Sequence, residues 1–328
     1  MKFTYNDIIL VPKFNPFHSR KEVSTKVSDK RSKLSLGVPI MTANMDSVTG
    51  YTMANAISKY GGVGTLHRFC NIEDNIEMFK KSPSQTFVSV GCSDSELERA
   101  EALRDAGAEF FCIDIAHGHS ASMRDMLTKM RAMLPNACIM AGNVATVEAC
   151  LFLQDLGADI VKVGIGPGSV CSTRTTTGFG MPQASAVSVI SRHPSVRVSI
   201  VADGGIKTSG DVVKALALGA DFVMIGSMFA GTEVCPGTVD SEGFMVYRGM
   251  ASHEAYEDFF GEKIPVYKTS EGVSRRVKVK SFDKVMQDLI GGLRSGMTYG
   301  GASNLEELKN VSYEIISNSS HVEGTPHF

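Results

Sequence analysis

The chain has 328 residues, of which 43% are hydrophobic and 21% are charged, and its formal net charge is −2. These values are typical of a globular protein with a large core, and they argue against a disordered chain and against a generally basic, nucleic-acid-binding surface. The start "MKFTYNDIILVPKF" lacks the blocks of a signal peptide, and no apolar stretch is long enough to span a membrane. We therefore expect a cytoplasmic protein whose partners are small molecules rather than nucleic acids or membranes.

The seven cysteines are odd in number and irregularly spaced, and no Cys-x-x-Cys pair occurs. This pattern argues against a disulfide framework and against a structural zinc site, and it fits a reducing compartment.

Eight short apolar runs alternate with helical periodicity and are predicted as parallel strands, because each run is apolar on both faces. They lie at 38–44, 61–67, 86–91, 137–143 and 198–205, and at the ends of the segments 102–115, 152–165 and 215–227. The last three segments resemble one another, and Gly107, Gly157 and Gly219 stand where a left-handed residue ends a helix. The alternation allows a doubly wound sheet or a (β/α)₈ barrel, and the count of eight favours the barrel.

Polar or glycine-rich residues follow most of these runs and would gather at the mouth of a barrel, where barrel enzymes carry their active sites. The loops after the seventh and eighth runs are where barrels commonly bind phosphate. A single acid after a strand is more often a helix cap, and a single glycine more often serves a tight turn. The phosphate candidates are Gly204, Gly205, Gly226 and Ser227.

One loop, "GIGPGSVCSTRTTTGFGMPQ" at 164–183, places Cys171 among glycines, hydroxyl residues and the cation of Arg174. Backbone N–H donors and a neighbouring cation are the setting in which a thiol becomes a reactive nucleophile. The loop alone leaves open a glycine-rich turn with an incidental cysteine.

The barrel pattern loosens over 235–280, where short alternating stretches and glycines predict a mobile flap or hairpin inserted after the eighth strand. A final barrel helix follows, and 304–328 is predicted as a polar C-terminal tail. We thus expect one catalytic barrel domain over 1–328.

With Cys171 in "GPGSVCSTR", and with "ADGG", "VMIGSMFAG", "YRGM", "SEGV" and "GGLRSGMTYGGA" in order, nearly the whole chain resembles the IMP dehydrogenase and GMP reductase family. The resemblance implies a (β/α)₈ barrel, a purine 5′-monophosphate substrate, a nicotinamide cofactor and a homotetramer. It also implies that Cys171 attacks C2 of the purine, that Thr173 and Glu271 relay protons, and that Asp203 holds the ribose.

The resemblance assigns further residues by position. Those that would bind the substrate, besides Asp203 and the phosphate candidates, are Gly249, Met250, Ala251, Lys268, Ser270 and Gly272. Those that would bind the cofactor are Ser19, Arg20, Arg68, Asp114, Ile115, Ala116, Ile165, Gly166, Ser295 and Thr298. The main-chain carbonyls that would hold a monovalent cation, K⁺, are those of Gly166, Gly168, Cys171 and Arg174.

Two features favour the reductase within this family. No CBS-domain pair interrupts the chain after the second strand and its helix, and "ASHEAYEDFFGEKIPVYKTS" between Met250 and Glu271 lacks the Arg-Tyr dyad with which the dehydrogenases activate water. We therefore expect NADPH-dependent conversion of GMP to IMP and ammonia through a Cys171 thioimidate.

Several details point the other way. "GSMFAGTEVCPG", "LRSGM" and the terminal "SSHVEGTPHF" look more like a dehydrogenase, and Ala251 and Lys268 depart from the serine and arginine of the reductases. The alternatives are an IMP dehydrogenase without CBS domains, a purine-nucleotide sensor without turnover, and a flavin-dependent barrel oxidoreductase.

Overall fold

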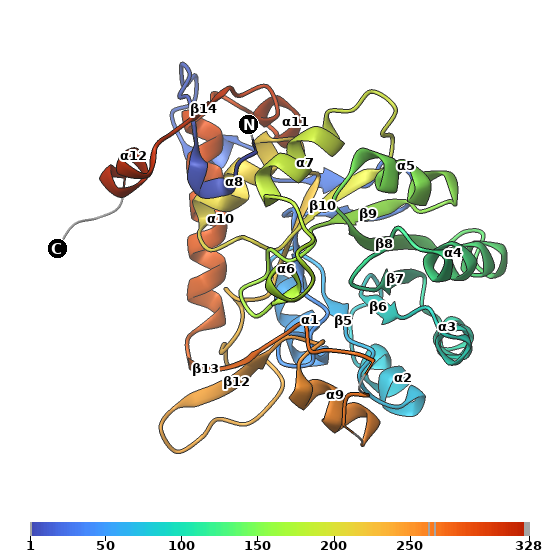
Figure 1. Ribbon diagram of the computed structural model, residues 1–328. Coiled ribbons are helices and arrows are strands. Elements are labelled where there is room, and N and C mark those ends of the chain that lie inside the picture. Colours follow the sequence, from blue (N-terminus) through green and yellow to red (C-terminus); the bar gives the residue numbers. More distant parts are fainter. Residues whose placement is uncertain (1, 262, 266, 325–328) are drawn as a thin grey trace.

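The computed structural model describes residues 2–261, 263–265 and 267–324, and its centre is an eight-stranded parallel barrel (Figure 1). The strand order is β4-β11-β10-β9-β8-β7-β6-β5, and a parallel bridge between Met41 and Val63 joins the two ends of the sheet. The predicted (β/α)₈ barrel is confirmed, and each strand coincides with a predicted apolar run, although β8 extends one residue beyond its run. The strands are β4 (Ile40–Thr42), β5 (Thr65–Leu66), β6 (Phe87–Val90), β7 (Phe110–Asp114), β8 (Cys138–Val144), β9 (Ile160–Val163), β10 (Ser199–Asp203) and β11 (Phe222–Ile225).

Eight helices surround the barrel, and a short helix, α6 (Thr173–Thr177), lies in the Cys171 loop. Gly107, Gly157 and Gly219 follow the ends of α3, α5 and α8 with φ of +99°, +96° and +112°, as their spacing predicted. The surrounding helices are α1 (Tyr51–Lys59), α2 (Ile72–Lys80), α3 (Asp94–Asp105), α4 (Ala121–Met133), α5 (Val147–Asp155), α7 (Gln183–Ser191), α8 (Ser209–Ala217) and α10 (Phe282–Tyr299).

Side chains alternate along each strand between the barrel interior and the layer beneath the helices. On β9, Val161 and Val163 pack in the outer layer, whereas Ile160 packs in the interior with Phe87 and Phe222. Lys162 therefore lies on the interior side of β9, near its carboxyl end.

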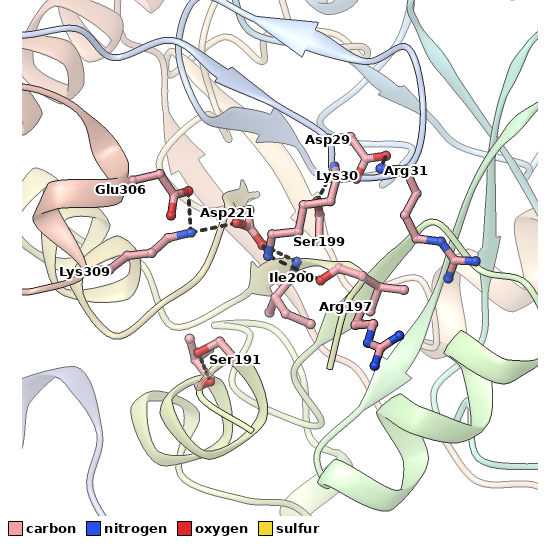
Figure 2. A network of polar contacts seen from close by, with 12 residues as sticks. Asp29, Lys30, Arg31, Ser191, Arg197, Ser199, Ile200, Asp221, Glu306 and Lys309 are labelled. Atoms are coloured by element: carbon pink, nitrogen blue, oxygen red, sulfur yellow. Dashed lines mark hydrogen bonds and ion pairs between the residues drawn. The ribbon is translucent and has the colours of Figure 1, made fainter. Parts of the chain in front are cut away.

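At the amino-terminal end of the barrel, two of the three repeated segments place a bonded aspartate directly before the strand. Asp221, which precedes β11, accepts hydrogen bonds from the N–H of Ile200 at 2.8 Å and from Lys30 and Lys309 at 2.8 Å each (Figure 2). Asp159, before β9, accepts in the same way from the N–H of Ile139 at 2.9 Å. These carboxylates tie neighbouring strands together on the side away from the Cys171 loop.

The segment 235–280 forms an antiparallel pair, β12 (Phe244–Arg248) and β13 (Ser274–Lys278), with α9 (His253–Phe260) between them. Arg248 donates to Asp46, in the loop after β4, at 2.6 Å and to Asp258 of α9 at 2.5 Å. One guanidinium thus joins the flap to the barrel mouth. Residues 262 and 266 of this segment lie outside the described residues.

A segment near each end of the chain takes part in a small sheet, in which β1 (Ile8–Leu10) pairs antiparallel with β14 (Tyr313–Ile315). The segment predicted as a polar tail thus contributes a strand, and its residues 325–328 lie outside the described part. Among the described helices none has the length and apolar character needed to cross a membrane. The remaining elements are η1 (Tyr5–Asp7), η2 (Arg20–Glu22), β2 (Val27–Ser28), β3 (Ser35–Leu36), α11 (Leu305–Leu308) and α12 (Asn318–Glu323).

Candidate active site

A chain of hydrogen bonds joins Cys171, Thr173 and Glu271. The Cys171 thiol, on an exposed residue just before α6, donates to Oγ1 of Thr173 at 3.2 Å, and that hydroxyl donates to Oε2 of Glu271 at 2.7 Å. Thr173 is buried. The donors run from the thiol to the carboxylate, which is the direction in which a proton must leave a thiol that becomes a nucleophile.

Main-chain bonds hold the flap against the Cys171 loop, so that residues about 100 positions apart in the sequence become neighbours. The N–H of Ser172 donates to the carbonyl of Glu271 at 2.8 Å, and the N–H of Val273 donates to the carbonyl of Val170 at 2.9 Å. A Cβ on Gly249 would lie 2.8 Å from that Val170 carbonyl oxygen, so only glycine allows this approach.

Most of the predicted base-binding residues lie at this junction of flap and loop. The N–H of Glu271 donates to the carbonyl of Ala251, Ser270 Oγ donates to the carbonyl of Gly272 at 2.8 Å, and the N–H of Asp46 donates to Sδ of Met250 at 3.2 Å. Lys268 is different. Its side chain is exposed, with Nζ over the rings of Tyr256 and Tyr267, so the structure does not bring it to Cys171.

Arg174 closes the Cys171 loop on itself. Its Nε donates to the carbonyl of Ile165 at 3.0 Å and its Nη2 to the carbonyl of Met181 at 2.5 Å. Burial lowers the pKa of Arg174, and the charge of Cys171 opposes that shift. The guanidinium is therefore near the thiol but directs these donors at the main chain.

The carbonyls predicted to hold a cation belong to this same loop. Those of Gly168 and Arg174 accept from the N–H groups of Cys171 and Gly178, at 3.1 Å each. Those of Gly166 and Cys171 accept no main-chain bond within the described residues. The loop thus offers carbonyl oxygens of the kind that hard cations bind.

Asp203 belongs to a polar group at the carboxyl ends of β7, β8, β9 and β10. Its Oδ2 accepts from Nδ2 of Asn143 at 2.8 Å and from Nζ of Lys162 at 3.3 Å, and Lys162 also pairs with Oδ1 of Asp114 at 2.5 Å. Sequence reasoning named both acids but missed Lys162. The sequence feature that could have identified Lys162 is the presence of a lysine inside the apolar run "DIVKVGI".

The pKa values in this group follow from its charges. Burial raises the pKa of Asp114, but the charge and hydrogen bond of Lys162, aided by a bond from Asn44, lower it further than burial raises it. Burial likewise lowers the pKa of Lys162, and Asp114 and Asp203 more than reverse that effect. Lys162 and Asp114 are therefore both charged at neutral pH.

The phosphate candidates lie beside the Cys171 loop. Gly204 and Gly205 have φ of +90° and +79°, and a Cβ on Gly204 would lie 2.9 Å from Pro167 in that loop. A Cβ on Gly226, which precedes Ser227, would lie 3.3 Å from the hydroxyl of Tyr247 on β12.

Two hydroxyl residues at this place were not predicted. Ser169 Oγ donates to the hydroxyl of Tyr247 at 3.3 Å, which links the Cys171 loop to the flap. Burial raises the pKa of Tyr247, so its hydroxyl keeps its proton and can donate. The sequence feature that could have identified Tyr247 is its position on a flap strand whose residues alternate between the two faces, on the face that is buried.

The predicted cofactor residues fall into two groups. Those near the mouth lie at or just after the carboxyl ends of β5, β7 and β9, and they are Arg68, Asp114, Ile115, Ala116, Ile165 and Gly166. The other four lie around η2 and on α10, in the outer ring, where Nη1 of Arg294 donates to the carbonyl of Arg20. The structure does not join this second group, Ser19, Arg20, Ser295 and Thr298, to the Cys171 loop.

A cavity of about 870 Å³ opens between α9 of the flap and the loops that lead into α2 and α3. Arg68, Phe69, Phe259 and Phe260 are among its lining residues. Arg68 lies 3.8 Å from Glu96 and 4.9 Å over the ring of Phe69, and it is close enough to Asp114 to lower the pKa of that carboxyl. Cys171, Thr173 and Glu271 do not line the cavity.

Comparisons with known proteins agree on the kind of barrel. A family model described as "IMP dehydrogenase / GMP reductase domain" matches residues 2–327. A GMP reductase of Buchnera aphidicola is 38% identical, over 97% of this chain and 95% of its own length. A crystal structure of GMP reductase from Trypanosoma brucei in complex with guanosine 5′-monophosphate has a TM-score of 0.93 at 27% identity, covering 100% of this chain and 98% of that one. A crystal structure of inosine 5′-monophosphate dehydrogenase from Legionella pneumophila has a TM-score of 0.88 at 50% identity, covering 97% and 99%.

Proposed function

Because the chain belongs to the IMP dehydrogenase and GMP reductase family, we propose that it is a GMP reductase, which converts GMP to IMP and ammonia with NADPH as the reductant. The observation that carries the proposal is the donor chain from Cys171 through Thr173 to Glu271, held by a flap whose sequence between Met250 and Glu271 contains no arginine. That combination can activate a thiol but lacks the Arg-Tyr pair expected to activate water.

The reaction balances around C2 of the purine. The thiol of Cys171 passes its proton through Thr173 to Glu271, and the thiolate sulfur forms a bond to C2. Glu271 returns that proton through Thr173 to the 2-amino group, the C2–N bond breaks, and ammonia leaves a thioimidate on Cys171. NADPH, when bound, supplies the hydride that C2 receives. The C2–sulfur bond then breaks, its electron pair returns to sulfur, and IMP is released.

The rest of the site would hold the nucleotide during these steps. Asp203 would accept hydrogen bonds from the ribose hydroxyls. The loops carrying Gly204, Gly205, Gly226 and Ser227 would present N–H groups to the phosphate, with the Tyr247 hydroxyl as a further donor. Gly249 to Ala251 and Ser270 to Gly272 would flank the base, because Glu271 and Val273 share main-chain bonds with Ser172 and Val170, on either side of Cys171. Ala251 and Gly249 bond in turn to Glu271 and Val273.

The cavity beside the mouth fits a nicotinamide dinucleotide. Arg68 makes one long ion pair, 3.8 Å to Glu96, and no hydrogen bond within the described residues, so its guanidinium keeps donors for a phosphate, and Phe69, Phe259 and Phe260 offer faces for an adenine ring. Asp114, Ile115 and Ala116 would flank the nicotinamide riboside. Ser19, Arg20, Ser295 and Thr298, which lie apart, would serve the cofactor of a neighbouring subunit in a homotetramer.

The proposal also includes a bound monovalent cation and a cellular location. The carbonyls of Gly166, Gly168, Cys171 and Arg174 would bind K⁺ and so fix the conformation of the nucleophile's loop. All seven cysteines are free, which fits the reducing cytoplasm that we propose as the location.

IMP dehydrogenase is the second candidate, and the 50% identity to the Legionella pneumophila structure is the observation that favours it. One pair of assays separates the two. With GMP and NADPH we expect steady loss of NADPH absorbance and formation of IMP; with IMP and NAD we expect at most one equivalent of NADH per site and little free XMP. Steady multiple-turnover XMP production would overturn the reductase proposal. Tight GMP binding without turnover would indicate a sensor, and a yellow chromophore in the purified protein would indicate a flavoenzyme.

A further inference from the structure

Lys162 is the most completely buried cation at the active-site end of the barrel. Only 1% of its surface is exposed, and it stands in the barrel interior, in a register otherwise filled by side chains such as Ile160. An apolar side chain would fill this place at lower cost, since burying an ammonium loses its hydration. The cost indicates that the charge itself has a use.

The charge is shared between two carboxylates that the proposed function assigns to different ligands. The Lys162 ammonium lies 2.5 Å from Oδ1 of Asp114, on the cofactor side, and 3.3 Å from Oδ2 of Asp203, on the ribose side. Asn143 also donates to Oδ2 of Asp203, so both donors hold the same oxygen. The Oδ1 of Asp203 has no hydrogen-bond donor among the described residues, which leaves it available to a ligand.

We propose that Lys162 is a positioning residue that holds the carboxylates of Asp203 and Asp114 together in a fixed orientation, so that Asp203 can accept hydrogen bonds from the ribose of a purine nucleotide. This inference rests on the proposed function for the identity of the nucleotide. Without the ammonium, two carboxylates that now share one cation would repel each other, and one of them would take up a proton.

The other charged and titratable groups around this trio do not replace the ammonium. Burial raises the pKa of Cys112 to about 12, so its thiol is neutral. Burial also raises the pKa of Tyr247, whose phenol is likewise neutral. Arg68 also lowers the pKa of Asp114, but by less than Lys162 and Asn44 do. Cys92, after β6, also faces Asp114, and burial raises the pKa of its thiol to about 12, so it is neutral too. The groups that face the trio are thus Cys112 from β7, Cys92 after β6, Arg68 after β5 and Tyr247 from β12, and Lys162 is the cation that contacts both acids.

The test is the pH dependence of nucleotide affinity, measured without cofactor so that turnover does not enter. In Lys162→Met we expect GMP and IMP to bind more weakly than in the wild type. Loss of the ammonium should raise the pKa of the carboxylate pair in this variant. Below that pKa, the ratio of the variant's affinity to that of the wild type should fall by about tenfold for each pH unit. Titration calorimetry between about pH 6.5 and 8.5 measures this, and the ratio to wild type cancels the titration of the nucleotide's own phosphate.

Three further variants make the result specific. Lys162→Arg keeps the charge and should restore the wild-type pH profile. Lys162→Met combined with Asp114→Asn removes the repulsion and should flatten the profile again. Lys309→Met breaks a partly buried ion pair at the opposite end of the barrel (Figure 2), so it should lower Tm and leave the pH profile unchanged.

The outcomes separate this inference from the proposed function. Affinity in Lys162→Met within twofold of wild type across the pH range, or a double variant as pH-dependent as the single one, would overturn the positioning role. If Lys162→Met does not fold, the double variant and Lys162→Arg decide, and a steep profile in either contradicts the inference. A wild-type protein that binds neither GMP nor IMP would instead contradict the proposed function.

Discussion

Replacing Glu271 by glutamine tests the proton relay with the smallest change in shape. The flap should stay in place, because the N–H and carbonyl of residue 271 make main-chain bonds to Ala251 and Ser172 that the side chain does not affect. What is lost is the carboxylate that accepts the hydroxyl proton of Thr173 at 2.7 Å. A glutamine oxygen can accept that hydrogen bond but cannot take the proton, so the thiol would have to ionise without a base.

The expected effect falls on kcat. A general acid–base group contributes about 10²–10⁴-fold, which corresponds to roughly 3–5 kcal/mol in the activation free energy. We expect kcat with GMP and NADPH to fall by that factor and the GMP dissociation constant to change less than about threefold, because we propose that the loops after β10 and β11, and not Glu271, supply the phosphate contacts. Stopped-flow absorbance for turnover and calorimetry for binding measure the two quantities separately.

A matched control is Glu257→Gln, the same substitution at an exposed position on α9 of the flap. It should leave kcat unchanged. If Glu271→Gln retained kcat within threefold of wild type, or if both substitutions slowed turnover equally, the relay reasoning would be wrong and Glu271 would be a structural flap residue.

Two more substitutions test separate parts of the molecule. Cys171→Ala should abolish NADPH oxidation while GMP still binds, since in the proposed reaction the thiol makes the covalent bond and other loops hold the nucleotide; measurable steady turnover in this variant would refute the nucleophile assignment. Asp221→Asn should lower the free energy of unfolding by about 2 kcal/mol, because the carboxylate bonds Lys30, Lys309 and the N–H of Ile200, and it should leave kcat/KM for GMP unchanged. Chemical denaturation and steady-state kinetics check it, and a loss of activity without a loss of stability would contradict the division between the two ends of the barrel.

The fold was readable from the sequence because its signals are local. A parallel strand covered by helices is apolar on both faces, so a run such as "FFCIDI" can be recognised as a strand from its composition. A helix that ends in a left-handed turn needs a glycine such as Gly157. The positions after the strands could be assigned to one mouth because parallel strands share an orientation.

The contacts across the mouth were not readable in the same way. Glu271 was assigned from the resemblance, and only the main-chain bonds between the flap and the Cys171 loop show how it approaches Thr173. Lys162 was hidden because a lysine in an apolar run has no local partner; its partners Asp114 and Asp203 lie 48 and 41 positions away. Lys268 was assigned by position, and the flap directs it to Tyr256 and Tyr267 instead.

The two ends of the barrel use buried carboxylates in different ways. At the amino-terminal end, both oxygens of Asp221 are bonded, to two lysines and a main-chain N–H, so that this acid has no capacity left for a ligand. At the carboxyl end, Lys162 and Asn143 both donate to the same oxygen of Asp203, and the second oxygen has no donor within the described chain. An acid whose oxygens are all bonded contributes to stability, whereas an acid held by one oxygen is preorganised to bind with the other. The same residue type, placed before one strand and at the carboxyl end of another, is therefore fully bonded in one case and keeps an oxygen for a ligand in the other.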